Sequence, residues 1–219
     1  MRVGILFDLD GTLLDTLQDL TDSVNYALKQ FGCPARSPRE IRSFLGSGVA
    51  HLLKSALPGK PDDPELSQVL EVYKDYYSRH NCVKTAPYPG VLQAMAVLGE
   101  AYPLAIVSNK HHEAAASLCK HFFGENIYAL GERGDCPRKP APDMLLKAMA
   151  ELGVEGCIYV GDSEVDLETA KNTNVPCLCV TWGFRDEGDL KAAGAKETCA
   201  SPEQLAEQLI EMVETYYGQ

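Results

Sequence analysis

Positive charge is scarce in this sequence. Its 20 lysine and arginine residues stand against 31 aspartate and glutamate residues, which gives a net charge of −11. A nucleic-acid-binding protein normally needs a basic stripe to displace the counterions of the phosphates. We therefore expect no nucleic-acid partner. An acidic protein can still bind a small phosphate, provided that a metal ion and a few local donors offset the charge.

Long apolar runs are also missing. No segment reaches the length of about 20 apolar residues that a membrane-spanning helix needs, so we expect no membrane partner. The chain opens directly on the short apolar run Val3 to Phe7, without the basic and apolar leader of an exported protein. These observations predict a cytoplasmic protein, and the sequence leaves open whether it is a monomer or a homodimer.

Histidine and cysteine lack the spacings of a metal site. The five histidines and eight cysteines form no pattern that is typical of bound zinc. In a cytoplasmic protein, scattered cysteines are expected to be free thiols rather than disulfides.

Carboxylates, in contrast, do form a pattern at the start of the chain. Asp8, Asp10 and Gly11 directly follow the apolar run, which predicts a buried strand that ends in a tight turn. Side chains at positions i and i+2 of a strand point the same way. Two such carboxylates shift each other's pKa, so that one can serve as nucleophile or metal ligand and the other as acid or base. Taken alone, the stretch fits an Asp-rich turn equally well.

The rest of the chain divides into two kinds of pattern. Four helix patterns without a strand pattern lie between Asp15 and Tyr88-Pro89-Gly90, and a capping box at Ser37 begins one of them. From Val91 onward helix and strand patterns alternate, which predicts a mostly parallel sheet with helices on both faces. A second capping box is expected at Ser201. We predict an α/β core of residues 1–15 and 88–219 and a helical insertion of residues 16–87.

Three more polar signals follow apolar runs, in a fixed order. They are Ser108-Asn109, Lys139-Pro140 and the stretch from Gly161-Asp162 to Asp166. With the Asp8 stretch they make the chain resemble the haloacid dehalogenase-like hydrolase superfamily, and within it the phosphoglycolate phosphatase group. The resemblance implies a doubly wound, Rossmann-like core with a small helical cap inserted after the first strand.

The resemblance also implies roles for the aspartates. Asp8 would attack phosphorus and form an aspartyl-phosphate, while Asp10 would act as the acid and base. Mg²⁺ would be held by the Asp8 carboxylate, the Asp10 main-chain carbonyl and Asp162. Asp166 completes the acidic metal set, and we expect it to hold the ligands rather than to touch the ion.

Phosphoryl and substrate contacts are expected from the other motifs. Ser108 and Lys139 would stabilise the charge on the transferring phosphoryl group. Further substrate contacts are assigned to Asn109 and to the turn residues Gly11 and Thr12, with local hydrogen bonding also expected from Thr12. The leaving group would be selected within the insertion, where the candidates are Arg42, Gly46, Ser47 and Gly48, although a simple helix break explains the Gly-Ser-Gly stretch equally well.

These patterns predict a Mg²⁺-dependent phosphatase that acts on a small phosphorylated metabolite, with 2-phosphoglycolate as the first expected substrate. A pyrophosphatase, a sugar-phosphate or nucleotide phosphatase and a phosphomutase share the same machinery and stay open. The alternative from another class is a non-catalytic phospho-receiver or binding protein. Asp10 and the helical insertion argue against it, because a receiver needs neither.

Overall fold

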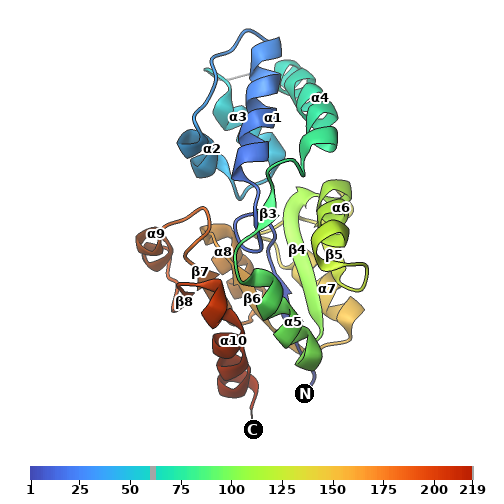
Figure 1. Cartoon of the computed structure of the whole chain (residues 1–219), viewed down its shortest axis with the longest axis vertical. Helices are drawn as coiled ribbons and strands as arrows, with labels where there is room; N and C mark the ends of the chain where they lie inside the picture. The colour runs from blue at the N-terminus through green and yellow to red at the C-terminus, as the bar shows by residue number, and fades with distance from the viewer. Residues whose placement is uncertain (60–62, 219) are drawn as a thin grey trace. The chain divides into compact units, whose positions relative to one another are not determined.

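The computed structural model describes residues 1–59 and 63–218. The chain divides into two compact units, one made of Met1–Leu14 with Pro87–Gln219 and the other of Asp15–Ala86. Figure 1 shows the sheet in the first unit and a group of helices in the second. Residues 60–62 of the predicted insertion lie outside the described residues.

A parallel sheet forms the centre of the larger unit. Over the described residues it has the strand order β5-β4-β1-β6-β7-β8, and neighbouring strands pair in parallel. This confirms the predicted α/β, doubly wound fold. The strands are β1 (Val3–Phe7), β4 (Leu104–His111), β5 (Tyr128–Glu132), β6 (Gly156–Gly161), β7 (Cys177–Val180) and β8 (Glu197–Cys199).

Helices cover both faces of this sheet because side chains alternate along each strand. Ile5 and Phe7 of β1 belong to one apolar core with residues of α5, α6 and α10, whereas Leu6 packs with residues of α7 and α8 on the opposite face. Buried on both sides, the central strands are therefore continuously apolar. The helices are α5 (Val91–Ala101), α6 (His112–Phe123), α7 (Asp143–Leu152), α8 (Glu164–Thr173), α9 (Glu187–Ala192) and α10 (Pro202–Tyr217).

The strand order changes direction at β1. This strand pairs with β4 on one side and with β6 on the other (Figure 1). In open α/β sheets, ligands bind at the carboxyl ends of the strands at such a switch point. Asp8 follows β1 directly, and its N–H donates to Val160 O of β6 at 2.8 Å. The first carboxylate therefore lies at the position where the fold favours a ligand.

The structure corrects three details of the predicted elements. Strand β4 does not end before Ser108 but continues to His111, which pairs with Glu132 after an irregularity in the register. The apolar pattern stops earlier because the last four residues of this strand are polar. Helix α9 and strand β8 are too short and too polar to give a signal. The capping box at Ser201 was wrong, since its side chain makes no cap hydrogen bond.

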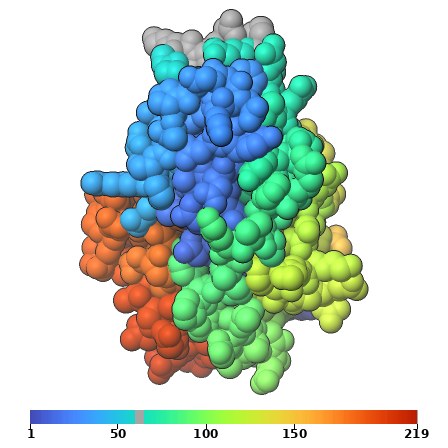
Figure 2. Space-filling model, turned by 45° about the horizontal axis from the view of Figure 1, so that its top comes forward, coloured from blue at the N-terminus to red at the C-terminus, as the bar shows by residue number. Residues whose placement is uncertain are grey.

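Helices make up the smaller unit. They are α1 (Leu17–Gln30), α2 (Pro38–Phe44), α3 (Val49–Ala56) and α4 (Asp63–His80). Helices α1 and α4 pack side by side, which Figure 2 shows as blue and blue-green surfaces in contact. The capping box at Ser37 is confirmed, because Glu40 N donates to Ser37 Oγ while Ser37 N donates to Glu40 Oε2.

Asp19 joins the two ends of this smaller unit by hydrogen bonds. Its buried carboxylate accepts hydrogen bonds from the main-chain N–H groups of Val83, Lys84 and Thr85 and from the Thr85 hydroxyl. The segments on either side pair as a two-stranded sheet of β2 (Leu14–Asp15) and β3 (Ala86–Pro87). The chain thus leaves and re-enters the larger unit through two adjacent, hydrogen-bonded strands.

Two expectations from composition can be compared with the structure. All eight cysteines are free, as predicted. Among the helices that the structure describes, none combines the length and the apolar character needed to cross a membrane.

Candidate active site

Three carboxylates meet at the carboxyl edge of the sheet. Asp8 follows β1, Asp162 follows β6, and Asp166 lies in the first turn of α8. All three are buried, and each offers an oxygen within 4.8 Å of the others. The fold therefore brings together residues that lie more than 150 positions apart in the sequence.

Lys139 lies at the centre of this cluster. Its Nζ is 2.9 Å from Asp8 Oδ1, 2.8 Å from Asp166 Oδ1 and 2.8 Å from the hydroxyl of Tyr159. Burial alone would lower the pKa of Lys139, but the carboxylates of Asp166 and Asp8 raise it above its usual range. The two carboxylates therefore favour the charged form of this buried lysine.

One ammonium is too little charge for three carboxylates. Burial raises the pKa of Asp8 to about 6, against the lowering effect of Lys139. Burial, followed by the charges of Asp166 and Asp8, raises the pKa of Asp162 well above its usual range. If all three carboxylates are ionised, Lys139 leaves two negative charges uncompensated, and carboxylate oxygens are the ligands that hard divalent cations prefer. The residues present therefore fit a divalent metal ion.

Both carboxylate oxygens of Asp166 bind neighbouring groups of the protein. Its Oδ1 binds Lys139 and accepts from the Tyr159 hydroxyl at 3.1 Å. Its Oδ2 accepts from the main-chain N–H groups of Asp162 and Ser163 and from Ser163 Oγ. Both oxygens of Asp166 thus have partners within the protein, and its orienting role at a metal site stays a prediction.

Tyr159 is a buried member of the site that the sequence analysis did not identify. Its hydroxyl accepts from Lys139, lies beside Asp166, and can donate to Val107 O at 3.1 Å. The only signal was a tyrosine inside an otherwise apolar strand two residues before Gly161-Asp162, and buried tyrosine hydroxyls usually have a partner.

Asp10 has a partner that the sequence analysis also missed. Lys110 Nζ lies 2.8 and 2.9 Å from the two carboxylate oxygens of Asp10. The lysine side chain is 5% exposed, whereas that of Asp10 is 19% exposed. Lys110 directly follows Ser108-Asn109, and its position on the extended part of β4 gives it this reach.

The two predicted site residues of β4 differ in their contacts. Ser108 is buried, and its Oγ accepts from Lys110 N at 3.3 Å. Asn109 forms a double hydrogen bond with the main chain of Lys139, its Nδ2 donating to Lys139 O and its Oδ1 accepting from Lys139 N, both at 2.9 Å. The observed contact of Asn109 therefore positions Lys139, and a contact with substrate stays a prediction.

The loop at residues 182–185 orients Asp162. The N–H of Phe184 donates to Asp162 Oδ2 at 2.6 Å, and Trp182 Nε1 donates to Thr12 O at 3.0 Å. Thr12 is fully buried, with its hydroxyl 3.4 Å from Asp162 Oδ1. The Thr12 hydroxyl thus contacts a distant part of the chain instead of its own turn, where local hydrogen bonding was expected, and its contact with substrate stays a prediction.

Two glycines allow these loops to approach. Gly11 has φ of +83°, and a Cβ on it would lie 2.3 Å from Asp162 Oδ2. A Cβ on Gly183 would lie 2.4 Å from both Asp162 Cβ and Gly11 O. A side chain at either position would displace Asp162 or the Asp8–Asp10 turn. The sequence analysis gave Gly11 a substrate contact, whereas the structure shows its close approach to Asp162.

The predicted leaving-group residues lie in the smaller unit. Arg42 is in the last turn of α2, and Gly46, Ser47 and Gly48 precede α3. Gly46 and Gly48 have φ of +112° and +82°, and no side chain caps α3. These dihedrals explain why glycine stands there, and the substrate contact stays a prediction.

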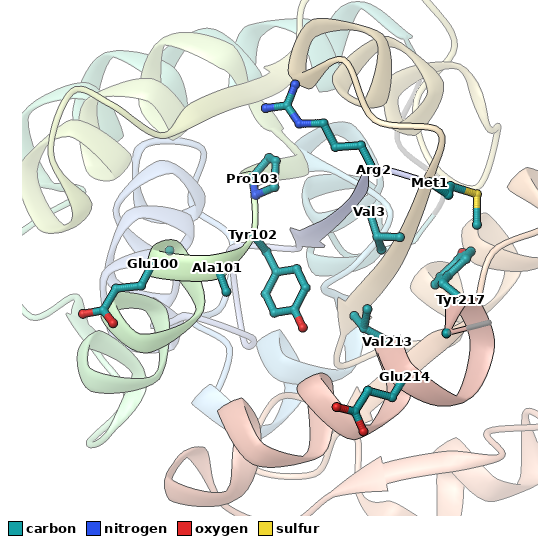
Figure 3. Close-up of a pocket in the computed structure, with 12 residues that line it drawn as sticks. Met1, Arg2, Val3, Glu100, Ala101, Tyr102, Pro103, Val213, Glu214 and Tyr217 are labelled. Carbon is teal, nitrogen blue, oxygen red and sulfur yellow. The ribbon is translucent and has the colours of Figure 1, made fainter.

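A cavity of about 650 Å³ lies at the opposite end of the sheet from the carboxylates. It is formed by residues 1–3 ahead of β1, residues 99–103 ahead of β4, and the end of α10 (Figure 3). Tyr102 and Tyr217 contribute rings to its wall. None of the predicted site residues lines it, so it is separate from the candidate site.

Comparisons with known proteins identify the family of this chain. Residues 5–180 match the family described as haloacid dehalogenase-like hydrolase. A phosphoglycolate phosphatase of Rhodobacter capsulatus is 34% identical over 190 residues, covering 84% of this chain and 87% of the relative. That of Aquifex aeolicus is 32% identical over 189 residues, covering 84% and 86%.

A solved structure extends the similarity to the fold. A protein from Lactobacillus delbrueckii subsp. bulgaricus, proposed to be a phosphoglycolate phosphatase, is 37% identical, with a TM-score of 0.87 and coverage of 94% of this chain and 97% of that one. The parallel sheet with its acidic cluster, the family match over residues 5–180 and these relatives lead to one conclusion: the chain belongs to the haloacid dehalogenase-like hydrolases and is similar to their phosphoglycolate phosphatases.

Proposed function

We propose that this protein is a Mg²⁺-dependent phosphatase that hydrolyses 2-phosphoglycolate through an aspartyl-phosphate on Asp8. Hydrolysis of a phosphate monoester is the coarser part of this function, and the family and the similar phosphatases support it. The observation that carries the proposal is the contact of Asp8 with the buried cation Lys139, beside Asp162 and two residues before Asp10.

The first displacement uses both aspartates of the turn. A carboxylate oxygen of Asp8 attacks phosphorus, and the bond between phosphorus and the leaving oxygen breaks. Asp10 donates its proton to that oxygen, so that the product leaves as an alcohol. Lys139 and Ser108 stabilise the charge on the phosphoryl oxygens during the transfer.

The second displacement regenerates the enzyme. Water attacks the phosphorus of the aspartyl-phosphate while Asp10, now a carboxylate, takes a proton from it. The bond to the Asp8 oxygen breaks, and inorganic phosphate is released. Asp10 is thereby protonated again for the next substrate.

Asp8, the main-chain carbonyl of Asp10 and Asp162 would hold the metal ion, with Asp166 orienting them. When bound, Mg²⁺ neutralises the repulsion between the Asp8 carboxylate and a dianionic phosphate. The uncompensated charge of the carboxylate cluster supports this assignment.

The loop at residues 182–185 offers a direct test of the metal site. Gly183→Ala is expected to raise the Mg²⁺ concentration for half-maximal phosphate release by about 10- to 100-fold, because its Cβ displaces Asp162. The measurement is a Mg²⁺ titration of the rate. Gly188→Ala is the matched control, since a Cβ there meets nothing within 4 Å. An unchanged titration for Gly183→Ala would contradict the assignment of Asp162.

The helical unit of residues 15–86 would act as the cap. Closure of such a cap excludes water from the reacting groups. We propose that Arg42 and the stretch Gly46-Ser47-Gly48 contribute to the choice of leaving group. The short paired strands β2 and β3 are the natural hinge, because the chain passes through them between its two units.

The test of this function is a substrate panel. Phosphate release is measured from 2-phosphoglycolate, sugar phosphates, nucleotides and pyrophosphate, with Mg²⁺ or with EDTA. Mg²⁺-dependent preference for 2-phosphoglycolate is the expected result. Preference for another compound of the panel would support the proposed mechanism but not the proposed substrate. If no compound is hydrolysed, the phospho-receiver or binding protein is favoured.

A further inference from the structure

The ion pair of Lys110 with Asp10 is not explained by the reaction alone. An acid that must donate a proton gains nothing from a buried ammonium bound to both of its carboxylate oxygens, at 2.8 and 2.9 Å. A lysine placed there stabilises negative charge instead. Its position beside the acid therefore points to a second use, toward the substrate.

Geometry limits what that use can be. Asp10 must reach the leaving oxygen, and Lys110 already binds Asp10. Two consecutive charge-assisted hydrogen bonds place the ammonium within about 5.5 Å of the leaving oxygen. In a 2-phosphoester of a hydroxy acid, the carboxylate is separated from that oxygen by a single carbon atom. The ammonium is thus close enough to bind this carboxylate when Asp10 is in position to act.

We propose that Lys110 is a specificity-determining residue that binds an anionic group carried by the leaving alcohol, as in the 2-phosphoester of a hydroxy acid. The proposal rests on the proposed function and deepens it. An ammonium carries three N–H donors, so it can bind Asp10 and a second anionic acceptor at once. Asp10 is the more exposed member of the pair, at 19% against 5%, which gives the leaving group access to this side.

Charge explains why this contact discriminates. The phosphate dianion is common to all substrates, and in the proposed reaction it faces Asp8 and Lys139 rather than Lys110. Only the leaving alcohol differs, and a poorly solvated ammonium favours an anionic one strongly over a neutral one. A site with Lys110 therefore selects phosphorylated hydroxy acids over phosphorylated simple alcohols of the same size.

The experiment compares the binding of 2-phosphoglycolate and ethyl phosphate, by calorimetry with Mg²⁺, to protein carrying Asp8→Asn so that neither ester turns over. We expect 2-phosphoglycolate to bind at least about 30-fold more tightly than ethyl phosphate. Adding Lys110→Met should reduce this ratio to within about 3-fold, whereas Lys110→Arg should retain most of it. Lys147→Met, which removes the exposed partner of Asp135, is the matched control and should leave the ratio unchanged.

Each other outcome overturns the proposal. Equal weakening of both esters by Lys110→Met would show that Lys110 acts only by holding Asp10. If Lys110→Met leaves the preference for 2-phosphoglycolate over ethyl phosphate unchanged, another part of the protein binds the carboxylate, such as the start of α3. If the Asp8→Asn protein binds the two esters equally or binds neither, the proposal fails even where Lys110→Met does not fold. Failure of the proposed function is seen separately, as the absence of phosphate release from 2-phosphoglycolate by the unmodified protein.

Discussion

Asp8→Asn is expected to lower phosphate release from 2-phosphoglycolate by at least about 10⁴-fold, because an amide cannot replace a carboxylate as the nucleophile. The fold should be kept. Asparagine has nearly the same shape, and burial disfavours the carboxylate at this position, since it raises the pKa of Asp8 to about 6. At pH 7 the folded protein therefore loses no favourable ionisation in the variant.

The measurement pairs phosphate release with thermal unfolding. We expect the melting temperature of Asp8→Asn to equal or exceed that of the unmodified protein. Asp135→Asn is the matched control, because Asp135 is an exposed partner of Lys147 and is not part of the carboxylate cluster, and its turnover should be unchanged. Turnover above about 1% in a folded Asp8→Asn protein would remove Asp8 as nucleophile.

Asp10→Ala is expected to lower turnover of 2-phosphoglycolate by about 10²- to 10⁴-fold, the usual contribution of a general acid. Turnover of p-nitrophenyl phosphate should fall much less, because p-nitrophenolate leaves without being protonated. The measurement compares the fold decrease in turnover of 2-phosphoglycolate with that of p-nitrophenyl phosphate, both with Mg²⁺ at the same pH. Equal losses with both esters would contradict the acid role.

The Asp10→Ala variant needs a control for its effect on Lys110. Asp10→Ala leaves the ammonium of Lys110 without the carboxylate that it binds in the structure, and an uncompensated buried charge is itself costly. Asp10→Asn keeps a hydrogen-bond acceptor at that position. If protonation of the leaving group is the reason for the loss, both variants should show the same dependence on the leaving group.

Local patterns were enough to predict the sheet and most of its helices. The central strand Val3–Phe7 was predicted from an apolar run closed by Asp8 and Gly11, and its burial on both faces explains why that run is continuous. The failures have local causes as well. The end of β4 was missed because its last residues are polar, and β8 has only three residues, too few for a period to be recognised.

The candidate site was predicted unevenly. Asp8 and Asp162 were named because acidic residues that directly follow apolar runs give a visible signal, and Asp166 because its stretch resembles the family motif. The structure brings the three together. Tyr159 and Lys110 gave no such signal. A tyrosine in a strand and a lysine after a strand are common, and only their neighbours in space distinguish these two.

Nearby positions were enough to place acidic side chains after the apolar runs of β1 and β6, because the alternation of strand residues and the geometry of turns are local properties. The partners of these side chains depend on the fold. Lys139 bridges Asp8 and Asp166, and Lys110 holds Asp10, because the strand order sets β4 and β6 on either side of β1. Buried charges must find opposite charges within a few ångströms, and that distance is a property of the packed sheet rather than of any stretch of chain.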